Sequence, residues 1–179
     1  MSIDQPSIRR IVTGHHTDGR SCFLQDGPSP VEIATPGRPG YRVTNLWRTA
    51  PGETVDAPDA IVEHQGIHPP HGGTVLRIVE WPAEPADPAE LRRQMEETFA
   101  HMYPDAHRKL QPGEHPGMHQ TDTVDYAIVL EGEAVAIMED GERVMRAGDI
   151  LIQRGTKHAW ANRSGKPMRI AFILVDPQR

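Results

Sequence analysis

"GMHQTDTVDYAIVLEGE", residues 117–133, decides the fold and supplies half of a candidate site. Successive side chains of a strand point to opposite faces, so residues two apart share a face. One face of the predicted strand carries His119, Thr121, Thr123 and Asp125. The opposite face carries Val124, Tyr126, Ile128 and Leu130. The stretch therefore places an imidazole, two hydroxyls and a carboxylate at the mouth of an apolar strand.

Taken alone, this pattern favours an ordinary strand with its apolar face on the core and its polar face in water. Two further features favour a site. Beyond Asp125 the polar face continues as Ala127 and Val129, so we expect the strand to be covered on both sides. The stretch "GTKHAWAN" puts His158 and Trp160 on one face of a second short strand. Two imidazoles and a carboxylate converging in a barrel predict a divalent-metal site.

The rest of the chain reads as short strands separated by turns. The Asp18-Gly19 and Asp140-Gly141 pairs suit tight hairpin turns. Residues 50–73 lack periodicity, and their histidines (His64, His68 and His71) are interpreted as part of a solvent-exposed loop. The strands are expected at residues 8–14, 21–25, 41–49, 74–81, 125–132, 133–148, 149–155, 158–164 and 168–176. Many short strands at this spacing predict an all-β sandwich or jelly-roll barrel.

One helix is predicted over residues 88–102. Asp87 is suited to cap it, Pro88 suits its first turn, and Glu90 occupies the acidic position of a capping box. Apolar residues recur every three to four positions and form one stripe, made of Leu91, Met95, Phe99 and Met102. We expect this stripe to pack on a sheet.

Residues 117–175 resemble the two-motif core of the cupin superfamily. The positions that match the first motif are His119, Asp125 and Gly132. The positions that match the second motif are Gly148, Asp149, Gly155, His158 and Asn162. Thr121 stands where the first motif usually has its second histidine, and Gln153 stands where the second motif usually has proline. The chain is also similar to a subgroup of single-barrel cupins with RTDT-DY and QRGT-HAW-N motifs.

The resemblance implies a cupin double-stranded β-helix, or jelly-roll barrel, with a small-molecule pocket at its mouth. It implies that His119, Asp125 and His158 hold one divalent metal ion (Fe, Mn, Ni or Zn) and carry catalysis. The expected substrate is a small organic acid, cyclic or aromatic, or a carbonyl compound, and the expected reaction is oxygenation, decarboxylation or isomerisation. Two alternatives stay open: a metal-free cupin that binds a small ligand, and a metal-free enzyme with a histidine base.

Composition excludes several other classes. The chain has 179 residues and a formal net charge of −6, with no cluster of Lys and Arg, so nucleic acid is not an expected partner. It has no run of about 18 apolar residues, so no membrane span is predicted. Residues 1–10 lack an apolar signal core. Cys22 is the single cysteine, which rules out an internal disulfide and favours the cytoplasm.

The predicted division of the chain is a cupin barrel over residues 71–179 and a β-stranded extension over residues 1–70. A cupin core needs about a hundred residues, so the extension is surplus to it. The outer face of the strand after residue 124 is apolar and needs cover. We therefore expect the extension to pack on the barrel, or on a partner subunit in a homodimer with a swapped edge.

Overall fold

The computed structural model describes residues 6–177. Residues 1–5, which belong to the segment inspected for a signal core, and residues 178–179 lie outside the described part. The largest sheet has six strands in the order β3-β4-β5-β11-β6-β9. Their bounds are β3 Val31–Ala34, β4 Arg42–Thr49, β5 Thr74–Trp81, β11 Met168–Val175, β6 Val124–Glu131 and β9 Ile150–Arg154. All neighbouring strands of this sheet run antiparallel.

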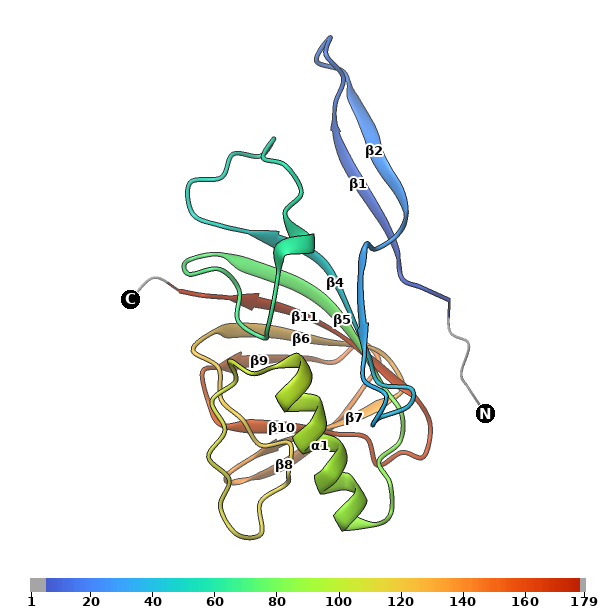
Figure 1. Cartoon of the computed structure of the whole chain (residues 1–179), viewed down its shortest axis with the longest axis vertical. Coiled ribbons are helices and arrows are strands. Elements are labelled where there is room, and N and C mark those ends of the chain that lie inside the picture. The colour runs from blue at the N-terminus through green and yellow to red at the C-terminus, as the bar shows by residue number, and fades with distance from the viewer. Residues whose placement is uncertain (1–5, 178–179) are drawn as a thin grey trace.

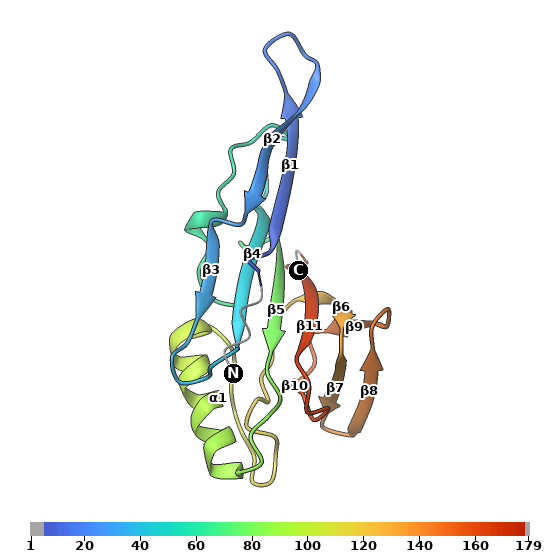
Figure 2. The same ribbon diagram turned by 90° about the vertical axis from the view of Figure 1, so that its right-hand side faces the viewer.

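A second sheet of three strands has the order β10-β7-β8. Its strands are β7 Glu133–Met138, β8 Gly141–Arg146 and β10 His158–Ala161. The two sheets face each other, and helix α1, Pro88–Met102, lies across one open side between them (Figures 1 and 2). The predicted all-β jelly-roll barrel with one amphipathic helix is therefore confirmed. No helix among residues 6–177 is long and apolar enough to cross a membrane.

The core fills the space between the two sheets. Inward positions of β5, β6 and β11 alternate with outward ones, as the two-residue period of a strand requires. The largest fully buried apolar side chains include Val75, Val129, Met168 and Ile170. The turn between β6 and β7 needs Gly132, because its φ is +77° and an added Cβ would meet Pro167 O at 2.6 Å.

The ordinary strand pattern would place the face with Tyr126 and Leu130 on the core, but strand β6 points its other face inward. Ala127 and Val129 are inside the barrel, at 0% and 1% exposure, and Asp125 is buried on the same face. Tyr126 and Leu130 on the other face are 42% and 45% exposed. Residues 6–177 of one chain therefore do not supply the expected cover over this outer face, and its cover by a partner subunit stays a prediction. The neighbouring strand β9 continues the bare apolar outer face, and no described layer lies over it.

Helix α1 begins as predicted, with one difference. The Asp87 carboxylate accepts a hydrogen bond from Ala89 N at 3.0 Å, and Pro88 is in the first turn. Glu90 does not complete a capping box, because its carboxylate accepts hydrogen bonds from Arg93 and Gln94. The buried side chains of the helix are Met95, Thr98, Phe99 and Met102.

The N-terminal residues form two structures. A hairpin of β1, Arg9–His15, and β2, Ser21–Pro28, projects beyond the large sheet (Figures 1 and 2). Its base is held by Arg10, which donates to Leu46 O at 3.0 Å and pairs with Asp59 at 2.7 Å.

Strands β3 and β4 instead extend the large sheet of the same chain, because β4 pairs with β5. The segment from β4 to β5 contains only the short 3₁₀ helix η1, Ile61–Glu63. The division at residue 70 stays a prediction.

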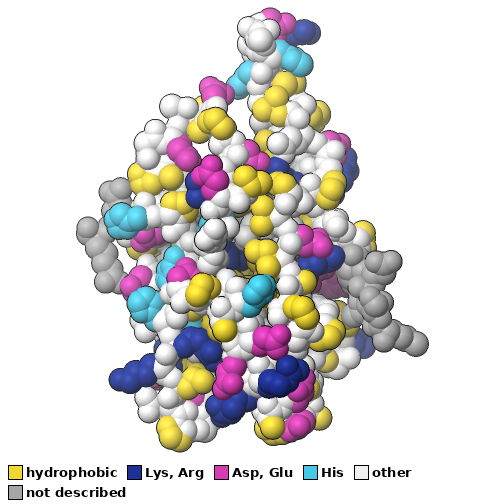
Figure 3. All heavy atoms as spheres, in the orientation of Figure 1, with side chains coloured by type: hydrophobic (Ala, Val, Ile, Leu, Met, Phe, Trp, Pro, Cys, Tyr) yellow, Lys and Arg dark blue, Asp and Glu magenta, His cyan; other side chains and the backbone are white. Residues whose placement is uncertain are grey.

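The surface mixes charges of both signs. On the face shown in Figure 3, Lys and Arg side chains lie among Asp and Glu side chains and do not gather into one basic patch. Elsewhere in the chain, surface charges of opposite sign pair, such as Arg163 with Glu142 at 2.8 Å.

Candidate functional site

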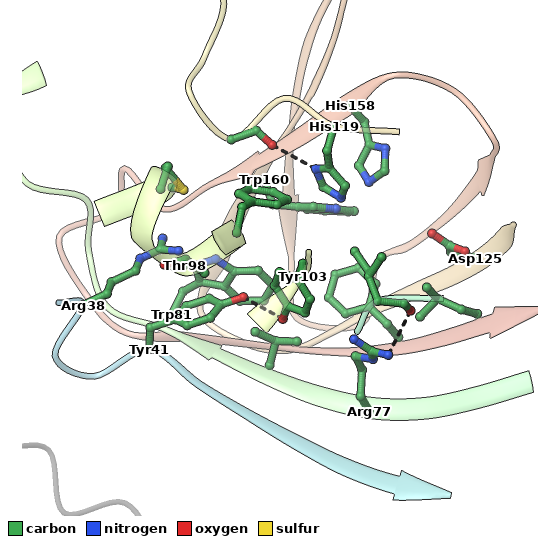
Figure 4. A pocket seen from close by; sticks show the side chains of 17 residues that line it. Arg38, Tyr41, Arg77, Trp81, Thr98, Tyr103, His119, Asp125, His158 and Trp160 are labelled. Atoms are coloured by element: carbon green, nitrogen blue, oxygen red, sulfur yellow. Dashed lines mark hydrogen bonds between the residues drawn. The ribbon is translucent and has the colours of Figure 1, made fainter. Parts of the chain in front are cut away.

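A cavity opens between the two sheets beneath helix α1. Open solvent at its mouth included, it contains about 620 Å³ of empty space. Its walls are mainly aromatic and apolar, with Trp81, Phe99, Trp160 and Phe172 among them (Figure 4). Polar groups reach it at a few points only. His119, Asp125 and His158, the three residues selected from the sequence, all line it.

The imidazoles of His119 and His158 lie side by side because their backbones are paired. His119 N donates to His158 O at 2.9 Å, and His158 N donates to His119 O at 2.8 Å. Residues directly opposite each other in an antiparallel pair project their side chains to the same face. The two ring centroids are accordingly 4.3 Å apart. A single backbone bridge thus brings together two histidines that are 39 positions apart in the sequence (158 minus 119).

Each imidazole is oriented by the carbonyl two residues before it. His119 Nδ1 bonds to Gly117 O at 2.9 Å, and His158 Nδ1 bonds to Thr156 O at 2.9 Å. A carbonyl oxygen can only accept, so both Nδ1 atoms carry the proton and both Nε2 atoms carry a lone pair. Neither Nε2 atom has a hydrogen-bond partner among residues 6–177.

Burial keeps both rings neutral. His119 is 8% exposed and His158 is 3% exposed. Burial, followed by the neighbouring His158, lowers the pKa of His119 to about 3. Burial also lowers the pKa of His158. The cavity therefore presents two neutral imidazoles with free lone pairs at physiological pH.

Asp125 enters the cavity from β6, apart from the histidine pair (Figure 4). Its side chain is buried, and Oδ1 has no hydrogen-bond partner in the described part of the chain. Burial raises the pKa of Asp125 to about 6, although the Thr123 hydroxyl and the charge of Arg77 act in the opposite direction. Asp125 therefore exchanges a proton close to neutral pH.

The donor set fits part of the predicted metal site. Donation from Nδ1 to a backbone carbonyl, with Nε2 left free, is the arrangement of metal-binding histidines. Residues 6–177 contain no group of three or more His, Cys, Asp or Glu side chains placed to hold a metal ion. Thr121, at the position of the missing histidine, accepts a hydrogen bond from Thr123 Oγ1 at 2.9 Å. The role of Asp125 as a ligand therefore stays a prediction.

Five further polar residues line the cavity and were not predicted from the sequence: Arg38, Tyr41, Arg77, Thr98 and Tyr103. Arg77 left a signal, because it interrupts the inward face of β5 between Val75 and Val79. Arg38 and Tyr41 left none, since they belong to the loop that leads into β4 and no local pattern shows that this loop reaches the barrel.

Other histidines lie outside the pair. His115 is bonded to Glu84 through Nε2 at 3.0 Å and accepts from Gly117 N through Nδ1, so both ring nitrogens are engaged. His64 is 6% exposed, which corrects its placement in a solvent-exposed loop. Its Nε2 atom accepts from Arg77 at 2.9 Å. His64 is buried because it follows η1 directly and accepts a hydrogen bond from the buried Arg77 guanidinium of β5.

Comparison with known proteins gives the family. The family model described as "Cupin domain" matches residues 106–175. Oryzines biosynthesis cluster protein J of Aspergillus oryzae is 30% identical over 97% of this chain and 85% of its own length. The cupin-domain-containing oxidoreductase srdB of Neurospora crassa is 33% identical over 96% of this chain and 76% of its own. Phomopsin biosynthesis cluster protein C' of Diaporthe leptostromiformis is 28% identical over 97% of this chain and 82% of its own. The match to srdB at 33% identity over most of both chains, together with the barrel and the matched motif positions, shows that the chain belongs to the cupin superfamily.

Proposed function

We propose that the protein is a small-molecule enzyme whose reaction takes place at the His119–His158 pair, on a small organic acid or carbonyl compound. The observation that carries the proposal is the pair itself: two neutral imidazoles, fixed through Nδ1, present free Nε2 atoms to an aromatic cavity. Relatives named as cupin-domain oxidoreductases and as proteins of biosynthesis clusters support a role in small-molecule chemistry.

The pair is proposed to hold one divalent metal ion through its two Nε2 atoms. Neutral imidazoles do not have to release a proton before they bind a metal, so the low pKa of His119 favours binding at neutral pH. Such an ion would supply Lewis-acid polarisation of a substrate oxygen. Fe, Mn, Ni and Zn are all suited to imidazole ligands.

Asp125 is proposed to handle a proton. With a pKa of about 6 it is present in both forms near neutral pH, which suits a general acid or base. Its unpaired Oδ1 is available to a bound substrate. Decarboxylation and isomerisation both require such a proton transfer.

A second candidate is a metal-free cupin that binds a small ligand or uses a histidine as base. The observation that favours it is the hydroxyl pair of Thr121 and Thr123, which occupies the corner where the superfamily usually has a second histidine. In this case the free Nε2 atoms would accept hydrogen bonds from the ligand.

Elemental analysis of untagged protein separates the two. The comparison uses wild type, His119→Ala, His158→Ala and the surface control His101→Ala, whose side chain is exposed on α1. We expect close to one metal ion per chain in wild type and in the control, and loss in both pocket variants. Metal retained in the pocket variants, or none in wild type after reconstitution, would overturn the metal site.

Assembly and location complete the proposal. We propose a homodimer, because the outer face of β6 and β9 is apolar and bare: Tyr126, Leu130, Ile150 and Ile152 are 42–60% exposed. Tyr126 and Ile152 are direct cross-strand partners, so these side chains form one continuous patch. The single Cys22 supports the proposed cytoplasmic location.

A further inference from the structure

The cavity contains an arginine, Arg38, whose guanidinium has no hydrogen-bond or salt-bridge partner among the described residues. Arg38 lies in the loop between β3 and β4, where Arg38 N donates to Thr35 O and Tyr41 N donates to Arg38 O. These turns direct its side chain inward, and it is only 3% exposed. Its guanidinium carbon lies 4.3 Å from the centre of the Tyr41 ring. Figure 4 shows the side chain directed toward Thr98 and the aromatic wall.

No residue in the range 6–177 forms a hydrogen bond or salt bridge with the Arg38 side chain. The charge of Glu84 acts on it from a distance, but the Glu84 carboxylate is hydrogen-bonded to His115 at 3.0 Å. Stacking on Tyr41 uses the flat face of the guanidinium and leaves its N–H groups free at the edge.

Arg77, which is equally buried in the same cavity, provides the contrast. It donates to His64 Nε2 at 2.9 Å and to Ile67 O at 3.0 Å. These bonds hold the loop before β5 and give Arg77 a structural role. Arg38 holds nothing of this kind.

A buried cation without hydrogen-bond partners lowers the stability of the folded chain. Arg38 stays charged despite this burial, because a guanidinium does not lose its proton in proteins. A side chain that only packed in this position would be less costly as methionine or leucine. The arrangement is therefore that of a site whose missing partner is an anion that enters the cavity.

We propose that Arg38 binds the carboxylate of the substrate and that the substrate is a small aromatic or similarly flat carboxylic acid. The proposal rests on the proposed function of the same cavity and adds the substrate class and a specificity residue. A single guanidinium edge matches a carboxylate, which it binds with two parallel hydrogen bonds. A phosphate dianion would call for more donors at this end of the cavity, and Arg77 is already engaged.

The walls select the body of the substrate. Trp81, Trp160 and Phe172 meet edge to face, with centroids 6.0 Å and 5.4 Å from Phe172. Rings set in this way favour a flat π-system over a flexible aliphatic chain. Arg38, the two tryptophans and the histidine pair line the same cavity (Figure 4). A substrate held by Arg38 therefore presents the end away from its carboxylate to His119 and His158.

The test is binding and needs no turnover. Benzoate, phenylacetate and cinnamate are each titrated against the matching neutral amide, and phenyl phosphate is included. Dissociation constants come from calorimetry or from the intrinsic tryptophan fluorescence, to which Trp81 and Trp160 of the cavity contribute. The proteins are wild type, Arg38→Met, Arg38→Lys, His158→Ala and the surface control Arg143→Met, with metal content and thermal unfolding measured for each.

We expect at least one acid to bind wild type about tenfold or more tighter than its amide, as one charge-assisted bidentate pair allows. Arg143→Met should keep this preference, Arg38→Lys should reduce it, and Arg38→Met should abolish it with metal content unchanged. The phosphate should bind more weakly than the acids.

Three results would overturn the proposal. They are an acid preference that survives in Arg38→Met, a preference that is lost in His158→Ala but not in Arg38→Met, and no binding of any acid to wild type below about 10 mM. The second result would place the carboxylate at the histidine pair and leave the proposed function intact. An Arg38-dependent acid preference in a protein without metal would instead remove the metal site and leave this inference standing.

Discussion

The hydroxyl oxygens of Tyr41 and Tyr103 lie 3.0 Å apart in the wall of the cavity. Tyr41 precedes β4, and Tyr103 follows the last turn of α1, where its N–H donates to Phe99 O. Both rings are buried, at 4% and 8% exposure, and burial raises the pKa of each hydroxyl. A neutral hydroxyl pair thus joins the N-terminal strands to the helix that covers the barrel.

Removal of this hydrogen bond should cost stability in a coupled way. Tyr41→Phe and Tyr103→Phe should each lower the free energy of unfolding by about 1 kcal/mol, because each leaves one buried hydroxyl without its partner. The double variant should cost less than the sum. Urea unfolding of the four proteins measures the coupling in a double-mutant cycle. Strict additivity would show that the two hydroxyls do not interact in solution.

The fold was largely predictable because its signals are local. The Asp140-Gly141 pair is the turn between β7 and β8, and the cap at Asp87 starts α1 at the predicted residue. Alternation after Asp125 also identified β6 correctly. Which face of β6 points inward was not predictable from alternation alone, because both faces are apolar there and the choice depends on the strands packed against it.

Only the site residues that lie at cupin motif positions could be predicted from the sequence. His119, Asp125 and His158 were selected by position, and all three line the cavity. Their role as metal ligands stays a prediction. Arg38 and Tyr41 reach the cavity through the pairing of β4 with β5, which joins residues 25 to 38 positions apart (74 minus 49 to 80 minus 42). No local period encodes such a contact.

Glu80 should be worth more to stability than an ordinary surface carboxylate. Its carboxylate accepts from Arg42 Nε at 2.5 Å and from Arg169 at 2.7 Å, so it joins β4, β5 and β11. Burial raises the pKa of Glu80, but these bonds outweigh it and leave the pKa below its usual value. Glu80→Gln should therefore lower the free energy of unfolding by about 2 kcal/mol at neutral pH.

The stability that Glu80 contributes should decrease at acidic pH. A depressed carboxyl pKa adds stability above the unfolded pKa, and this is lost as the pH falls through the folded pKa. The difference between wild type and Glu80→Gln should shrink below about pH 4. Glu142→Gln is the control, since its pair with Arg163 is half exposed and should contribute less than about 1 kcal/mol. Equal losses in the two variants would show that burial of the network adds nothing.

The apolar outer face of β6 and β9 should be a dimer interface. Ile152→Lys places a charge in the middle of the patch, beside Tyr126. We expect it to weaken self-association by about tenfold to a hundredfold. Val55→Lys is the control, because Val55 is 97% exposed in the loop before η1. Sedimentation velocity over a concentration series measures both, and a wild-type chain that stays monomeric at all concentrations would exclude the interface.

Asp125 should make stability depend on pH in the opposite direction to Glu80. Burial raises its pKa from 3.8 to about 6, so between these values the native chain keeps a proton that the unfolded chain has lost. Stability due to this group therefore falls as the pH rises through the window and levels off above it. Asn cannot titrate, so Asp125→Asn should match wild type near pH 4 and exceed it by about 3 kcal/mol at pH 8.

Urea unfolding at a series of pH values checks this. The histidine pair titrates in both proteins and cancels in the difference. Asp140→Asn serves as the control, because its exposed side chain lies in a hairpin turn that Asn-Gly also favours, and its difference from wild type should stay flat. A destabilised Asp125→Asn at every pH would mean that the charged carboxylate has a partner in the folded protein. In a metal-loaded sample that partner would be the ion, and the loss should then disappear after chelation.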